Sequence, residues 1–335
     1  MYIPNVFKRA LLLGCLSVLS LQTLAHENKI KDENTDKTIS QLYHSLNSKP
    51  KSDMATRLQI ISAEFLGKPY LLGPLGEGIQ GEFDQSPLQR TDAFDCETLV
   101  DTVVALALAD DPHQFKYCIN QIRYRNGRVS FIDRNHFTCL DWNKNNQHKG
   151  FVKDITTTVI DNHHQPVAKF AHALINKPGW YNHFSTDSIR LQRPDPIEQT
   201  KRLSSLKQRG SQLPAGISTL PYVPLSILFD STGKPNTYLF KQIPNGAIIE
   251  IVRPNWDLTK EIGTHLNVSH LGFAFWENGN LIFREASSEY HRVVDVSLID
   301  YLHDALKSPT IKGINIQIVQ PKQDSISGCG AKRLH

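Results

Sequence analysis

The sequence predicts an α+β fold in which a helix beginning at Cys96 packs on a central antiparallel sheet, with polar segments inserted. Three observations support this prediction. Residues 246–252 form a β-branched run typical of a buried strand. Residues 267–276 and 281–287 flank Asn278-Gly279, the strongest short signal of a tight hairpin turn. Apolar residues after Cys96 recur with helical spacing, at Leu99, Val100, Val103, Val104 and Ala107.

The first 25 residues are expected to be a secretory signal peptide. Lys8-Arg9 precedes an apolar run over residues 10–21, and small residues allow cleavage after Ala25. A looser match to a lipoprotein signal at Cys15 is the alternative. No later apolar run is long enough to cross a bilayer, so we expect the mature chain in a bacterial periplasm and not in the membrane.

The domain organisation follows from composition. The 335 residues carry a formal net charge of +4, part of which belongs to the leader, so the mature chain is nearly balanced and no nucleic-acid partner is expected. Residues 26–50 are polar and are interpreted as a flexible arm. Residues 51–320 are expected to form one domain and residues 321–335 a tail. We expect a monomer.

Apolar spacing and chain breakers place the elements of the first half. A helix is expected over residues 52–65, ended by Gly67 and Pro69, and a glycine-rich loop follows. The Cys96 helix should end near residue 110, and a second helix should continue to residue 122. Residues 128–132 alternate like a short strand. Residues 144–215 are interpreted as a polar insertion that shapes specificity, with a strand at 154–160 and a helix at 196–208.

Cys96 is the candidate nucleophile. Asp95 occupies the position of a helix N-cap, which places Cys96 at the first helical residue. Unpaired backbone N–H groups and the positive end of the helix dipole favour the thiolate, the form that attacks carbonyl carbons. The alternative is a buried core cysteine, but the position at a helix start favours the nucleophile.

The second half is expected to complete the sheet, with a helix over residues 297–306 and a strand over 314–319. If Asn278-Gly279 is a two-residue turn, then Glu277 pairs with Asn280 and the register of the whole hairpin follows. The segment 268–274 then lies opposite the segment 283–289.

In that register His270, Glu285 and Ser287 share one face. Glu285 is diagonal to His270, about 7–8 Å away between Cα atoms, which a glutamate side chain can bridge. A nucleophile, a histidine that takes its proton and a polar group that orients the histidine form the catalytic group of cysteine hydrolases. Gly272 and Ala274 on the same face are small, and we expect them to let the Cys96 helix approach the sheet closely.

Residues 133–143 combine charged and aromatic side chains. Arg134, Asn135, His136 and Trp142 are candidate substrate-binding residues, and Ser287 is a further one on the sheet. A surface loop with its own hydrogen bonds is an equally good interpretation of residues 133–143.

Four cysteines follow the leader, at positions 96, 118, 139 and 329, too few for a disulfide scaffold. A catalytic Cys96 must stay unpaired, and Cys118–Cys139 is a candidate bridge. His136 lies three residues before Cys139, and His291 is also available, so a zinc amidase is one alternative. No metal-binding spacing recurs, so no metal or other cofactor is expected.

The segments FLGKPY (residues 65–70), FDCETLV (94–100) and VSHLGF (268–273) resemble the NlpC-type papain-like cysteine peptidases of bacterial cell walls. Residues 246–252 match the strand that usually precedes the catalytic histidine in these enzymes. More narrowly, FIDRNH (131–136), Asp141-Trp142 and LIFREAS (281–287) resemble the N-acetylmuramoyl-L-alanine amidase-like subfamily, first catalogued as a domain of unknown function. The resemblance spans about residues 55–320.

The resemblance implies a papain-like core, no metal and cleavage of an amide in peptidoglycan. Members of the subfamily release the stem peptide from muramic acid and prefer soluble fragments that end in anhydro-muramic acid. By position, Cys96 matches the nucleophile, His270 the general base, and Tyr70 a tyrosine whose hydroxyl could help the Cys96 N–H hold the oxyanion. Glu285 stands where the group commonly has histidine, and Ser287 is its rival for orienting His270.

The spacing from Tyr70 to Cys96 exceeds that of typical NlpC-type enzymes. We expect the extra loop, with Pro74 and residues 76–81, to rebuild the substrate pocket. Two further alternatives to the amidase remain open. One is an endopeptidase that cuts between D-glutamate and diaminopimelate in the stem peptide. The other is a catalytically inactive module that binds the cell wall.

Overall fold

The computed structural model describes residues 33–48, 52–321 and 328–330. The expected signal peptide, with Cys15 and Ala25, lies outside these residues. The helices are α2 (Met54–Ala63), α3 (Cys96–Leu108), α4 (Pro112–Arg123), α5 (Asn143–His148), α6 (Lys177–Asn182), α7 (Pro196–Gly210), α8 (Leu225–Leu228), α9 (Thr237–Phe240) and α10 (Leu298–Ala305). The strands are β1 (Val152–Asp154), β2 (Lys169–Ile175), β3 (Gly216–Pro224), β4 (Ala247–Leu258), β5 (Thr264–Glu277), β6 (Asn280–Ser287), β7 (Arg292–Ser297) and β8 (Gly313–Val319).

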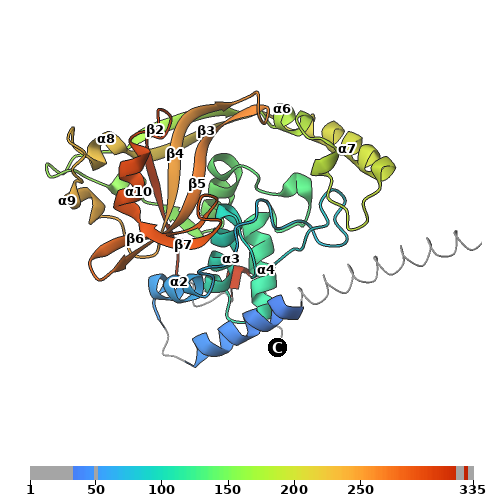
Figure 1. The fold of residues 1–335 in the computed structure, drawn as a ribbon, viewed down its shortest axis with the longest axis horizontal. Helices are drawn as coiled ribbons and strands as arrows, with labels where there is room; N and C mark the ends of the chain where they lie inside the picture. Colours follow the sequence, from blue (N-terminus) through green and yellow to red (C-terminus); the bar gives the residue numbers. More distant parts are fainter. Residues whose placement is uncertain (1–32, 49–51, 322–327, 331–335) are drawn as a thin grey trace, which may run out of the picture.

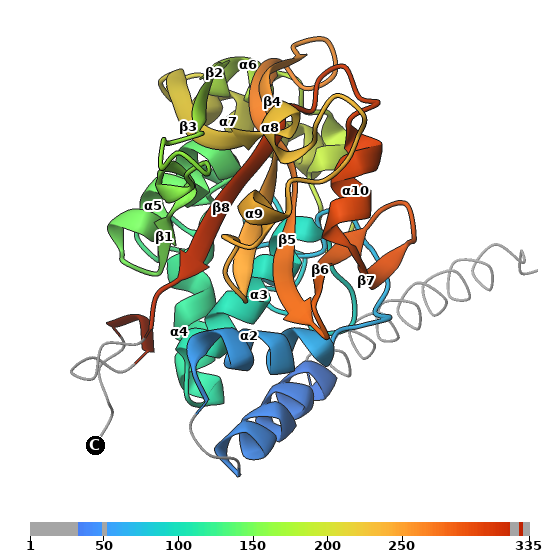
Figure 2. The same ribbon diagram turned by 90° about the vertical axis from the view of Figure 1, so that its left-hand side faces the viewer.

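The strands form one antiparallel sheet in the order β2-β3-β8-β4-β5-β6-β7, and β1 pairs with β8 beside this path. Helices α2, α3 and α4 lie on one side of the sheet, and α8, α9 and α10 lie on the other (Figures 1 and 2). The fold is therefore α+β, as predicted, with the Cys96 helix packed on the sheet. No helix in the described part of the chain is long and apolar enough to span a membrane.

Helix α3 is the centre of one hydrophobic core. Nearly all of its side chains are buried, and they share a cluster with Phe273 and Phe275 of β5, both 0% exposed. Removal of a fully buried phenylalanine ring typically costs about 3–5 kcal/mol of stability. This packing holds α3 in a fixed position against β5.

The expectation that α3 approaches the sheet over Gly272 and Ala274 was wrong. Ala274 belongs to the core on the α10 side of the sheet, because side chains alternate along β5 and α3 contacts the opposite face. A Cβ on Gly272 would lie 2.6 Å from the carbonyl oxygen of Arg284 and 2.8 Å from the ring of Phe283. The glycine therefore allows β6 and the Phe283 ring, not α3, to come close.

The register of the β5–β6 hairpin was predicted correctly. Glu277 pairs with Asn280, and the ladder runs back from there to Phe273 and Arg284. Asn278 and Gly279 both have positive φ, 52° and 83°, as a type I′ turn requires. The turn therefore determines which side chains of the two strands share a face.

Residues 33–47 form a helix, so the prediction of a flexible arm over residues 26–50 was wrong for this part. Ile39, Leu42, Tyr43 and Leu46 recur with helical spacing and are buried in the α3 core. The Tyr43 hydroxyl also donates to the carbonyl of Leu106, at 3.1 Å. The polar composition concealed this apolar stripe.

Residues 144–215 are more than a surface insertion. Strand β2 pairs along its whole length with β3 and extends the main sheet, and α7 matches the predicted helix. The expected strand at 154–160 was wrong, because β1 ends at Asp154 and a 3-10 turn, Thr156–Thr158, follows. The expected strand at 128–132 is absent from the structure, which has a 3-10 turn at Phe131–Asp133 instead.

The disulfide joins Cys118 of α4 to Cys329, with the Cα atoms 5.3 Å apart. Cys139 is free and buried, so the candidate bridge Cys118–Cys139 was wrong. The bridge ties part of the expected tail, residues 328–330, to α4. Cys96 remains unpaired and is partly exposed.

Candidate active site

Cys96 is the first residue of α3, as predicted. The Asp95 side chain caps the helix by accepting from the Thr98 N–H at 2.8 Å, and the Thr98 hydroxyl accepts from the Asp95 N–H at 3.0 Å. This reciprocal capping box fixes the direction in which the chain enters the helix. Asp95 also accepts from the Gly73 N–H at 2.8 Å, which ties the glycine-rich loop to the same end of α3.

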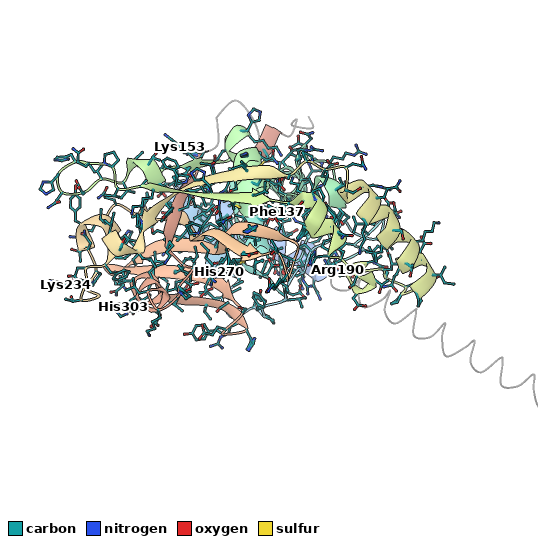
Figure 3. All side chains as sticks on the ribbon, turned by 90° about the horizontal axis from the view of Figure 1, so that it is seen from above. Phe137, Lys153, Arg190, Lys234, His270 and His303 are labelled. Atoms are coloured by element: carbon teal, nitrogen blue, oxygen red, sulfur yellow. A yellow bond between two sulfur atoms is a disulfide. The ribbon has the colours of Figure 1, made fainter. Side chains whose placement is uncertain are left out.

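His270 of β5 lies between Cys96 and Glu285. Its Nε2 is hydrogen-bonded to Oε2 of Glu285 on β6, so Nδ1 is the ring nitrogen left for the hydrogen bond with Cys96. Figure 3 shows His270 among the strands of the sheet. The diagonal pairing predicted from the hairpin register is therefore present. Ser287, the rival orienting group, accepts from the Tyr290 N–H at 3.3 Å and is hydrogen-bonded away from the imidazole.

The electrostatics of the site favour the imidazolium. Burial disfavours a charge on His270, but the Cys96 charge, the Cys96 hydrogen bond and the Glu285 carboxylate together raise its pKa to about 10. A protonated histidine beside the sulfur favours a thiolate–imidazolium pair. Such a pair has an attacking nucleophile and a proton for the leaving group already in place.

Aromatic side chains enclose the imidazole on the α10 side of the sheet. The ring of Tyr301 is nearly parallel to that of His270, with centroids 6.3 Å apart, and Phe283 meets it edge-on at 5.9 Å. Sequence reasoning missed Tyr301, although the spacing of Leu298, Tyr301 and Leu302 predicts that they share a face of α10. This packing leaves the imidazole little freedom to leave Glu285.

Tyr70, the candidate oxyanion residue, is close to the nucleophile. Its backbone forms a parallel bridge with Phe94, two residues before Cys96. Burial raises the pKa of Tyr70, and the charges of Cys96 and Asp95 raise it further. The Tyr70 hydroxyl is therefore a neutral donor near the sulfur at neutral pH.

Two of the predicted substrate-binding residues are buried. Trp142 is 1% exposed, and its indole N–H donates to Asp101 of α3 at 2.6 Å. Asn135 is 2% exposed and donates to the carbonyl of Ile122. Burial raises the pKa of Asp101 to about 7, despite the opposing charge of Arg123. Both side chains have the protein partners that a buried indole or amide needs, and their predicted role in substrate binding stays a prediction.

Arg134 and His136 are held by protein partners. Arg134 donates to Glu77 at 2.9 Å and to Asp84 at 3.1 Å. The Nε2–H of His136 donates to the carbonyl of Phe131 at 2.7 Å, and burial and the Arg134 charge lower the pKa of His136 well below the usual value. Their predicted role in substrate binding stays a prediction.

A buried charge network fixes the glycine-rich loop. Asp84, 0% exposed, is also ion-paired with Arg190, whose guanidinium donates to the Gly73 carbonyl. Burial disfavours ionisation of Asp84, but the charges of Arg134 and Arg190 hold its pKa below the usual value. Burial raises the pKa of the neighbouring Glu77. Because Gly73 also contacts Asp95, the network connects the loop to the start of α3.

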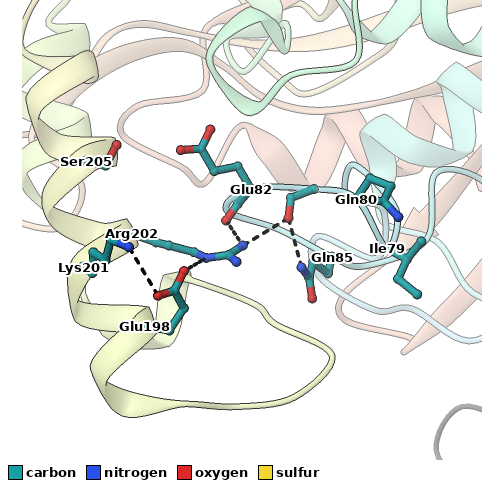
Figure 4. A pocket seen from close by; sticks show the side chains of 9 residues that line it. Ile79, Gln80, Glu82, Gln85, Glu198, Lys201, Arg202 and Ser205 are labelled. Atoms are coloured by element: carbon teal, nitrogen blue, oxygen red, sulfur yellow. Dashed lines mark hydrogen bonds and ion pairs between the residues drawn. The ribbon is translucent and has the colours of Figure 1, made fainter.

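A cleft of about 390 Å³ lies between this loop and α7 (Figure 4). Arg202 spans it, donating to Glu198 at 2.8 Å and hydrogen-bonding the carbonyl of Glu82. Its lining residues are Ile79, Gln80, Gly81, Glu82, Gln85, Glu198, Lys201, Arg202 and Ser205. The extra loop lines this pocket, but Cys96 and His270 are not among the lining residues, so the expectation that the loop rebuilds the substrate pocket stays a prediction.

The described ranges contain no group of three or more histidine, cysteine, aspartate or glutamate side chains that could hold a metal ion. His136, one residue of the considered zinc set, packs between the rings of Phe131 and Trp180. Cys139 is buried in a different cluster, with Ser218. The residues considered for zinc are therefore not brought together.

The model of the AmiA-like family, described as N-acetylmuramoyl-L-alanine amidase-like, matches residues 60–311. The crystal structure of a Legionella pneumophila protein, assigned to a domain family of unknown function, is 53% identical and superposes with a TM-score of 0.86. The match covers 90% of this chain and 99% of that one. No curated protein matches the chain.

More distant structures share the fold. An N-acetylmuramoyl-L-alanine amidase from Bacteroides uniformis is 21% identical with a TM-score of 0.55, covering 81% of this chain and 100% of that one. A putative xylanase from Bacteroides fragilis is 21% identical with a TM-score of 0.52, and the match covers 77% of this chain and 98% of that one. Because these two names differ, the fold alone does not decide the activity.

Proposed function

The chain belongs to the N-acetylmuramoyl-L-alanine amidase-like family, and from this membership we propose that it hydrolyses the amide between muramic acid and L-alanine with Cys96 as nucleophile. The family supports a hydrolase that acts on peptidoglycan. The observation that carries the cysteine mechanism is the hydrogen-bonded series Cys96, His270 and Glu285. The same series, with the nucleophile at a helix start, supports a papain-like core of the NlpC type.

In the first step the Cys96 thiolate attacks the carbonyl carbon of the lactyl group. The carbon–nitrogen bond to L-alanine breaks, and His270 gives its proton to the leaving amine. The products of this step are the free stem peptide and a thioester on Cys96. Glu285 keeps the imidazole oriented throughout by accepting from Nε2.

In the second step neutral His270 takes a proton from water, whose oxygen attacks the thioester. The carbon–sulfur bond breaks, the carboxylic acid of muramic acid leaves, and the thiolate–imidazolium pair is restored. In both tetrahedral intermediates the negative oxygen needs donors, which the Cys96 N–H and the Tyr70 hydroxyl supply.

For the substrate we propose soluble peptidoglycan fragments, with preference for anhydro-muramic acid. The cleft beside α7 is the proposed site for part of the fragment, because the glycine-rich loop that lines it is joined through Gly73 to the start of α3. We further propose that the protein acts as a monomer in the periplasm after cleavage at Ala25. N-terminal sequencing of the mature protein from a periplasmic fraction tests the cleavage.

The test of the activity is mass spectrometry of a muropeptide mixture, anhydro and reducing forms together, after incubation with the protein. Wild type should release disaccharide and free stem peptide, Cys96→Ser should release neither, and the buried-thiol control Cys139→Ser should retain turnover. A cut between D-glutamate and diaminopimelate would replace the amidase by an endopeptidase. Fragment binding without products from wild type would instead support a catalytically inactive wall-binding module.

A further inference from the structure

Arg253 is an arginine of β4 held by neutral groups. Its Nε–H donates to the Ser269 hydroxyl at 3.0 Å, and Nη1 donates to the Thr310 hydroxyl at 3.0 Å. The guanidinium lies over the ring of Trp256, 4.3 Å from the centroid, where a cation–π contact holds it. The side chain is therefore fixed in position while it remains half-exposed.

No carboxylate of residues 33–48, 52–321 or 328–330 lies within ion-pairing distance of Arg253, whereas the other partly buried arginines of the site have carboxylate partners. A guanidinium has five N–H donors, and the two bonds to Ser269 and Thr310 leave three without an acceptor in that part of the chain. Burial lowers the pKa of Arg253, with only Tyr301 opposing this effect. A fixed cation with a free edge is suited to a planar anion, because the guanidinium fork matches a carboxylate.

Arg253 is also beside the catalytic histidine. Ile251 pairs with His270 and Val252 with Val268, so Ser269 is the additional residue of a β-bulge in β5. The hydroxyl that positions Arg253 thus belongs to the residue before His270. The electrostatics of Tyr301 agree with this position. Burial is the largest cause that raises the pKa of Tyr301; the charges of Glu285 and Cys96 raise this pKa further, and the charge of Arg253 lowers it. Tyr301 is therefore within reach of both the reactive pair and Arg253.

We propose that Arg253, positioned by Ser269, Thr310 and Trp256, binds a carboxylate of the peptide that leaves when the amide is cut. The leaving nitrogen takes its proton from His270, so the peptide begins on the histidine side of the scissile bond, where Arg253 lies. The second residue of the stem peptide, D-glutamate, has a free carboxylate close to that bond. This inference rests on the proposed function and makes Arg253 a determinant of peptide specificity.

The test compares two muramoyl-peptide substrates that differ in one group, a free α-carboxylate or its amide on D-glutamate. Wild type should favour the carboxylate substrate by about 10- to 100-fold in kcat/KM, as a charge-assisted hydrogen bond predicts. Arg253→Gln should bring this ratio close to one by losing activity on the carboxylate substrate only. Arg128→Gln, which removes an exposed arginine outside the sheet, should keep the wild-type ratio.

A ratio that persists in Arg253→Gln would overturn the inference. An equal loss on both substrates would also overturn it, because that result would give Arg253 only a structural role in the β5 bulge. If wild type cleaves neither substrate, the proposed function fails, and calorimetry with the free stem peptide and its amide tests the carboxylate site separately. Wild type should then bind the acid more tightly than the amide, and Arg253→Gln should bind both alike; equal binding of the two by wild type would overturn the inference.

Discussion

Replacement of Glu285 by glutamine tests the charge that the structure places beside His270. The substitution keeps the size of the side chain and an oxygen for the Nε2–H, but it removes the negative charge. Glu285 is 3% exposed, so little water is available to replace that charge. The imidazolium should therefore lose its proton more easily, and the pH range of the thiolate–imidazolium pair should narrow from its alkaline side.

The size of the effect follows from the kind of hydrogen bond lost. A hydrogen bond to a charged group contributes about 1.5–3 kcal/mol, against about 1 kcal/mol for a neutral one. The difference, about 0.5–2 kcal/mol, corresponds to about one pH unit, since one pKa unit equals about 1.4 kcal/mol. The wild-type pKa of His270 is about 10, because Cys96 and Glu285 both favour its charged form. In Glu285→Gln the alkaline limb should move down by about one pH unit, while kcat/KM at pH 7, which lies well below both limbs, should change little.

The assay is the pH dependence of kcat/KM for amide hydrolysis, together with the rate of iodoacetamide alkylation of Cys96, which needs no substrate. The control is Glu289→Gln, which removes an exposed carboxylate from the loop after β6 and should leave both profiles unchanged. An alkaline limb at the same pH in Glu285→Gln and wild type would refute the role assigned to the Glu285 charge.

Three further predictions concern other parts of the fold. Burial raises the pKa of Glu250 to about 8 from an ordinary value of 4.5. The folded state therefore holds the Glu250 proton more tightly than the unfolded state, and the free energy of unfolding should fall by a few kcal/mol as the pH rises from 4.5 to 8. Thermal unfolding between pH 5 and 8 should show a weaker decline in Glu250→Gln than in wild type or in the exposed-site control Glu261→Gln; equal slopes would contradict the prediction. Gly272→Ala should lower stability by about 1–3 kcal/mol and reduce turnover, because the new Cβ pushes on the Arg284 carbonyl and displaces the strand that carries Glu285; an unchanged melting temperature would count against it. Under native, non-reducing conditions iodoacetamide should modify Cys96 and spare Cys118, Cys139 and Cys329, as intact-mass and peptide analysis can check; labelling of Cys118 would show that the disulfide is not formed.

The sequence was sufficient to predict those parts of the site whose geometry depends on one short motif. Asp95 before an apolar helix placed Cys96 at the helix start, and Asn278-Gly279 set the register that joins His270 to Glu285. Both outcomes depend on neighbours within a few residues or on one hairpin. The catalytic roles of these residues remain predictions.

Long-range packing was the part that the sequence did not reveal. Trp142 is buried because Asp101, 41 residues earlier, accepts its N–H. Cys118 and Cys329 are 211 residues apart, and only the complete fold brings them together. Tyr301 and Arg253 come from different elements and meet the site only when α10 and the β5 bulge are in place. A prediction from spacing has no means of finding such partners.

The position of β8 has a consequence for how the chain folds during synthesis. This strand follows all the others in sequence, yet it lies between β3 and β4 in the middle of the sheet. Until the ribosome has released residues 313–319, β3 and β4 keep open edges, and the sheet exists as two separate ribbons. Closure of the sheet must therefore be a late, long-range event, and slow folding with a need for chaperone protection is expected. A chain terminated at residue 311, the end of the recognisable family region, should fail to form this sheet.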